Sequence, residues 1–67
     1  MNMTDETRRF LEKELPEALN EKDVGNALWM LFELINDKGF APPHYDEYND
    51  FGRKAQLVYD DLYLSNR

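Results

Sequence analysis

The residue types best suited to chemistry gather in one segment, GFAPPHYDEYND, at positions 39–50. It holds the only histidine of the chain, His44, together with Asp46, Glu47 and Asp50. Imidazole and carboxylate groups bind metal ions and transfer protons. Their number and spacing decide whether either chemistry is available here.

A tightly bound metal ion is not supported by this segment. A transition-metal site usually takes several nitrogen or sulfur ligands, and the chain has one histidine and no cysteine. A calcium loop needs glycine at its sixth position and glutamate at its twelfth. Counted from Asp46 these positions hold Phe51 and Leu57, and counting from Glu47 also fails at the twelfth. We expect no metal ion and no other cofactor, with weak divalent binding by Asp46 and Asp50 as the remaining alternative.

Catalytic motifs are also missing from the sequence. None of the hydroxyl side chains lies in a nucleophile motif, and nothing singles out two carboxylates as an acid–base pair. Residues 50–52 spell the kinase tripeptide DFG, but the glycine-rich loop, the strand lysine and the catalytic loop of a kinase are absent. We therefore predict that the protein is not an enzyme.

Composition limits the partners of the chain. Its 67 residues predict a single domain, 1–67, and carry 14 acidic against 8 basic side chains, a net charge of −6. This charge disfavours direct binding to nucleic acid or to anionic membranes and favours basic partners. The first nine residues lack the pattern of a signal peptide, and no apolar run is long enough to span a membrane. With no cysteine present, we expect a soluble cytoplasmic protein.

The elements that must position these residues are helices. Helical spacing of apolar residues predicts helices over 5–14, 16–21 (short), 23–38 and 46–64. Thr4 is suited to cap the first, Pro16 breaks the chain after it, and Gly39 is suited to end the third in the left-handed conformation. Asp46, Glu47 and Asp50 are then expected at the start of the last helix. The fold class is all-α, a small three-helix bundle with room for a short fourth helix after Pro16.

Helix 23–38 is predicted to be central, because its apolar residues cover an arc of roughly 160°. We expect its core face to consist of Val24, Leu28, Leu31, Phe32 and Ile35, packed between Phe10, Leu11 and Leu15 on one side and Phe51, Ala55, Val58 and Leu62 on the other. Gly52 also falls on the seam of the last helix, which Tyr59 widens. A glycine there indicates a close helix crossing or an irregular helix start.

A few apolar residues fall on polar faces. Trp29 lies outside the apolar arc, and it either covers the N-terminal segment around Leu19 or serves as an exposed anchor for a partner. Leu57 and Leu64, seven residues apart, are candidates for an exposed patch, with scattered surface leucines as the plainer interpretation. These patterns predict a non-enzymatic protein–protein interaction or regulatory module that binds another protein, or a second copy as a homodimer, through Trp29, Leu57 and Leu64.

A second hypothesis is that the acidic surface binds the partner. The protein would then be an inhibitor or immunity-type protein that occupies a basic, often nucleic-acid-binding, site on its target. Binding by such a surface weakens steeply with salt, whereas binding by an apolar patch does not. The acidic residues concerned are Glu33, Asp37, Asp46, Glu47, Asp50, Asp60 and Asp61.

Overall fold

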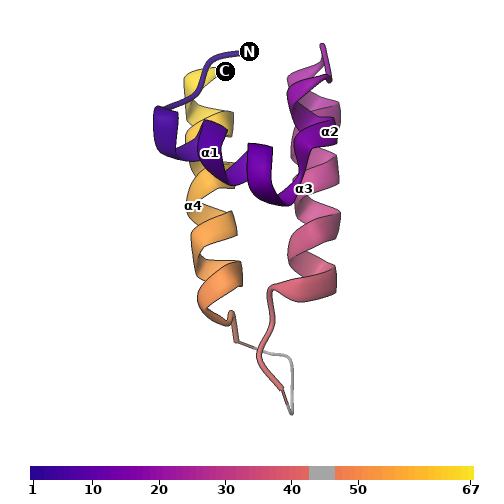
Figure 1. Ribbon diagram of the computed structural model, residues 1–67, viewed down its shortest axis with the longest axis vertical. Coiled ribbons are helices and arrows are strands. Elements are labelled where there is room, and N and C mark those ends of the chain that lie inside the picture. The colour runs from indigo at the N-terminus through magenta and orange to yellow at the C-terminus, as the bar shows by residue number, and fades with distance from the viewer. Residues whose placement is uncertain (43–46) are drawn as a thin grey trace.

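The computed structural model describes residues 1–42 and 47–67. Within them the chain forms four helices, α1 (Asp5–Glu14), α2 (Pro16–Leu19), α3 (Val24–Lys38) and α4 (Asp50–Ser65), and the predicted all-α fold class is confirmed. Helices α3 and α4 run side by side in opposite directions, and α1 and α2 lie across one face of this pair (Figure 1). None of these helices combines the length and the hydropathy needed to cross a membrane.

The first two helices are separated by Pro16, as the sequence predicts. Thr4 caps α1, and its side-chain oxygen accepts a hydrogen bond from the backbone amide of Thr7 at 3.3 Å. Leu15 leaves the helical conformation with φ −152° and ψ 62°, and Pro16 starts α2 at its first position. The break turns the chain so that α1 contacts α4 while α2 contacts α3.

Two glycines bring the end of α3 against the start of α4. A Cβ atom built on Gly52 would lie 2.7 Å from the carbonyl carbon of Gly39 and 2.9 Å from its Cα. The predicted left-handed conformation of Gly39 is wrong, because its φ is −91° and its ψ is 0°. Gly39 is instead suited to close packing, since a Cβ there would lie 2.6 Å from the carbonyl oxygen of Ile35. Of the two explanations for Gly52, the structure therefore shows the close approach, between the backbone at the end of α3 and the backbone at the start of α4.

Helix α4 begins at Asp50, four residues later than the predicted start at 46. Asn49 is the reason, because its side-chain oxygen accepts a hydrogen bond from the Gly52 amide at 2.7 Å while its Nδ2 donates to the Lys38 carbonyl at 2.8 Å. One side chain thus caps α4 and holds the end of α3. Glu47 precedes the helix and accepts a hydrogen bond through its backbone carbonyl from the Ala41 amide at 2.8 Å. The expected helical position of Asp46 lies outside the described residues.

The core lies where α1 and α2 cover the α3–α4 pair. Its buried apolar residues are Phe10, Leu11, Ala18, Ala27, Leu31, Ile35, Ala55, Val58 and Leu62. Phe10 on α1 contacts Phe51 on α4, with ring centroids 5.6 Å apart. The predicted core position of Phe32 is wrong, because 44% of its surface is exposed. The apolar arc of α3 is wider than its neighbours cover, and Phe32 lies on the uncovered flank.

Candidate functional site

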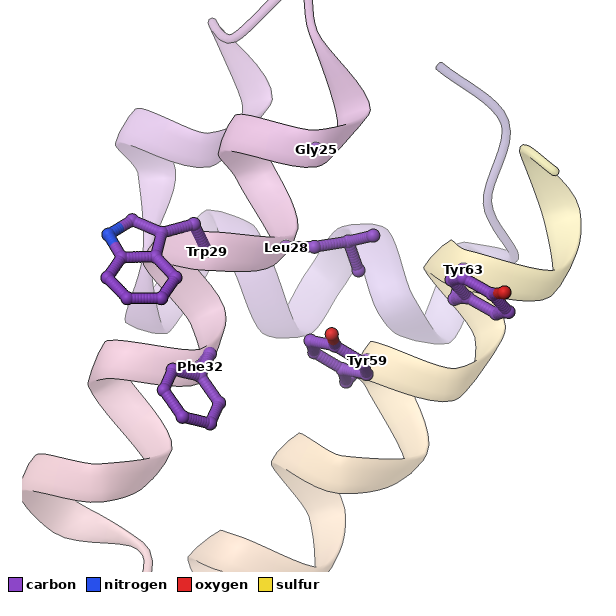
Figure 2. A pocket seen from close by; sticks show the side chains of 6 residues that line it. All are labelled: Gly25, Leu28, Trp29, Phe32, Tyr59 and Tyr63. Atoms are coloured by element: carbon purple, nitrogen blue, oxygen red, sulfur yellow. The ribbon is translucent and has the colours of Figure 1, made fainter.

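The uncovered face of the α3–α4 pair contains a shallow groove, which we call the aromatic groove. It has a volume of about 380 Å³ and lies on the side away from α1 and α2 (Figure 2). It is lined from α3 by Gly25, Leu28, Trp29 and Phe32, and from α4 by Tyr59 and Tyr63. Four of the six lining residues are therefore aromatic.

Helical spacing places these side chains in the groove. On α3, Gly25, Leu28 and Phe32 follow one another at intervals of three and four residues, and on α4 Tyr59 and Tyr63 are four residues apart. Figure 2 shows the two tyrosines across the groove from Trp29 and Phe32, with Leu28 pointing between the helices. The lining residues of each helix follow one side of that helix, so the groove runs along both α3 and α4.

The groove wall on α3 is held by ring stacking and is open to solvent. The rings of Trp29 and Phe32 stack with centroids 5.5 Å apart and an interplanar angle of 27°. Trp29 is nevertheless 60% exposed and Tyr63 53% exposed. Leu28 and Tyr59 are half-buried and pack against the core, which fixes the floor of the groove. The site is thus an exposed apolar surface on a packed base.

The structure separates the three residues that the sequence grouped as a partner surface. Trp29 is exposed and lines the groove, whereas its role as an anchor for a partner stays a prediction. Leu57 and Leu64 are also exposed, at 69% and 57%, but neither lines the groove. Leu57 lies two residues from Tyr59, roughly 200° around α4, so it faces outward. The two leucines therefore belong to a different face of the molecule from Trp29.

The acidic residues of the alternative hypothesis that the structure describes lie on α3, on α4 and, for Glu47, just before α4. Glu33, Asp37, Glu47, Asp50 and Asp60 are exposed. Asp46 lies outside the described residues.

Asp61 is partly buried and has a local partner. Its carboxylate accepts hydrogen bonds from the backbone amide of Thr4 at 3.1 Å and from the Thr4 hydroxyl at 3.2 Å. The hydrogen bond from the Thr4 amide, followed by that from the Thr7 side chain, lowers the pKa of Asp61 below its ordinary value of 3.8. Asp61 thus ties the N-terminal segment to α4.

The described residues give no support for a metal centre. Across 1–42 and 47–67, no three histidine or carboxylate side chains gather closely enough to hold an ion. Asp50 starts α4 and is exposed. Of the other three candidates, Glu47 is exposed and precedes α4, and His44 and Asp46 lie outside this part of the chain.

Most of the groove was missed by sequence reasoning. Phe32 and Tyr59 were assigned to apolar seams, and Tyr63 was not singled out. Two features of the sequence could have indicated the groove. Tyr59 and Tyr63 are four residues apart and so share one side of their helix, and the apolar arc of α3 is wide. Which of these flanks is covered depends on where α1 crosses, and no local pattern specifies that.

Comparison of the chain with protein family models, with characterised proteins and with solved structures finds no match.

Proposed function

We propose that this protein is a non-enzymatic interaction module that binds a partner protein through the aromatic groove. The observation that carries the proposal is the row of exposed aromatic side chains on a packed base, because exposed clusters of this kind are typical of protein interfaces. Tryptophan and tyrosine are also the residues that most often dominate binding energy. Trp29 is the central anchor in this proposal.

The size of the exposed surface fits a reversible interaction. If a fully covered aromatic ring buries about 200 Å², the exposed fractions of Trp29, Phe32 and Tyr63 correspond to roughly 300 Å². At about 25 cal/mol per Å² this surface supplies roughly 7–8 kcal/mol of gross stabilisation. The loss of translational and rotational freedom offsets about 4 kcal/mol or more of that gain. Tight binding therefore needs further contacts around the groove.

The second proposal is that the protein is an acidic inhibitor that binds its target through charged side chains. An acidic inhibitor would contact its target through charges spread over α3 and α4, and the aromatic groove would not have to be covered. Its binding would weaken steeply with salt and would be insensitive to apolar changes in the groove. The two proposals therefore differ in which variants abolish binding.

The experiment is a selection of binding peptides from a random displayed library, followed by binding to two variants. Phe32→Asp and Leu57→Asp each place a carboxylate at an exposed apolar position, the first in the groove and the second outside it. We expect the selected peptides to lose binding to Phe32→Asp and to keep it for Leu57→Asp. Failure to select any peptide, or peptides sensitive only to Leu57→Asp, would contradict the proposal. Binding that is insensitive to both changes but lost at high salt would favour the acidic surface.

A further inference from the structure

We propose that the occupant of the aromatic groove is a basic amphipathic helix of the partner protein. This inference rests on the proposed function, since it specifies what the groove binds. The partner helix would place its apolar face between Trp29 and Phe32 on one side and Tyr59 and Tyr63 on the other. Its lysine or arginine side chains would lie along the edges of the groove.

The charge of the groove walls supports a basic occupant. The wall segments, residues 24–37 of α3 and 55–66 at α4, contain no lysine or arginine. Glu33 follows Trp29 by one helical turn and so adds a carboxylate beside the α3 wall. Asp60 precedes Tyr63 by three residues on α4, where its carboxylate accepts a hydrogen bond from the Gln56 side chain at 3.0 Å. Both carboxylates are exposed. An occupant with basic flanks thus meets only carboxylates and neutral side chains on the two walls.

The backbone of the walls favours a helix over an extended peptide. An extended peptide normally gains affinity by pairing its backbone groups with the edge of a sheet. The two groove walls are helices, whose interior backbone groups are already hydrogen-bonded within each helix. A helix satisfies its own backbone groups and needs only side-chain contacts. The stretch from Gly25 to Phe32 is about 10 Å long, which accommodates roughly two turns of such a helix.

Gly25 supplies an independent observation on the groove. It is exposed and lines the groove near the N-terminus of α3. No backbone atom blocks a side chain there, because a Cβ would meet only Asp23, whose Oδ1 caps α3 and would lie 3.3 Å away. Gly25 is the second residue of α3, and glycine has a lower helix propensity than alanine. A missing side chain at the end of the groove lets a partner helix approach the α3 backbone closely.

A second copy of the chain is a poorer occupant on the same grounds. Each copy carries a net charge of −6. Two copies that met through their grooves would bring together walls that carry carboxylates and no lysine or arginine, so charge would oppose the pairing. The walls therefore favour a basic partner over self-association.

The test uses three synthetic peptides that lack tryptophan, so that the emission of Trp29, the only tryptophan of the chain, reports binding. The first is a lysine-rich helix with leucine at intervals of three and four residues. The second replaces its lysines by glutamate, and the third keeps its composition but scatters the leucines around the helix. We expect a blue shift of the Trp29 emission that saturates with the first peptide, and binding at least about tenfold weaker for the other two.

Two variants provide a matched control for the position of the partner. Gly25→Leu fills the end of the groove, whereas Asn26→Leu adds the same side chain to the exposed neighbouring position, which does not line the groove. We expect Gly25→Leu to weaken binding of the lysine-rich peptide about tenfold and Asn26→Leu to leave it unchanged. Equal effects of the two changes would overturn the inference. So would equal or tighter binding of the glutamate peptide.

The outcomes also separate this inference from the proposed function. Library peptides that need Phe32 but are neither basic nor helical would overturn the inference and leave the proposed function standing. Self-association that is lost in Phe32→Asp, measured by light scattering, would replace the basic helix by a second copy. If neither the library peptides nor the synthetic peptides depend on Phe32 for binding, the proposed function of the groove and the inference of a basic helix both fail.

Discussion

Replacing Gly52 by alanine should destabilise the protein, although alanine is the better helix former. The new Cβ would lie 2.7 and 2.9 Å from backbone atoms of Gly39, so the end of α3 must move away from the start of α4. That movement stretches the hydrogen bonds of Asn49 to Gly39 and Lys38, at 2.9 and 2.8 Å. Overpacking costs about 1–3 kcal/mol and each lost hydrogen bond about 1 kcal/mol, against a gain in helix propensity of about 1 kcal/mol. We expect a net loss of roughly 2–4 kcal/mol.

The assay is urea unfolding followed by circular dichroism, with Gly25→Ala as the control. A chain of this length has a free energy of unfolding of about 3–10 kcal/mol, so the loss from Gly52→Ala is a large part of the total. Gly25→Ala brings the same propensity gain at a position where the Cβ meets only the Asp23 side chain, so its stability should stay within about 1 kcal/mol of the parent. A Gly52→Ala variant as stable as Gly25→Ala would refute the close backbone contact.

Four further changes test other parts of the structure. Asn49→Ala should cost about 1–3 kcal/mol in thermal unfolding, because one side chain caps α4 and holds α3, and a change below about 0.5 kcal/mol would contradict that role. Because the pKa of Asp61 is lowered in the folded state, its stabilisation is present above its ordinary pKa and is lost as the pH falls through the lowered value. The difference in unfolding free energy between the parent and Asp61→Asn should therefore be constant well above the ordinary pKa of 3.8 and shrink as the pH falls below it, and a difference that stays constant there would argue against it. The double change Leu57→Asp and Leu64→Asp should alter stability by less than about 0.5 kcal/mol per site and leave the mass in light scattering unchanged, whereas a drop in mass would identify that face as a self-association surface. Leu31→Asp should abolish cooperative unfolding, because it places a charge at a fully buried position, and a sharp melt near the parent temperature would exclude this packing.

The helices of the N-terminal half could be predicted closely because their signals are local. Thr4, Pro16 and the apolar spacing of Phe10 and Leu11 specify a cap, a break and a buried face within a few residues of one another. The start of α4 could not be predicted in the same way. Asn49 competes with several acidic residues as a helix cap, and it is selected by its second hydrogen bond to Lys38, which depends on the folded arrangement of both helices.

The candidate site was predictable only in part, through Trp29. Sequence periodicity measures how wide an apolar arc is, but it does not say which flank a neighbouring helix covers. Helices α1 and α2 lie across one face of the α3–α4 pair, and so the flank that carries Phe32 and Tyr63 stays open. Leu57 and Leu64 were correctly expected at the surface, yet their direction around α4 takes them away from this flank.

The binding role of the aromatic groove is tested most directly by backbone amide NMR of the isotope-labelled protein, titrated with a peptide selected from the library. We expect the largest shift changes at residues 25–32 and 59–63 and at the indole N–H of Trp29. The largest changes at Leu57 and Leu64, with the groove resonances unmoved, would contradict the proposal.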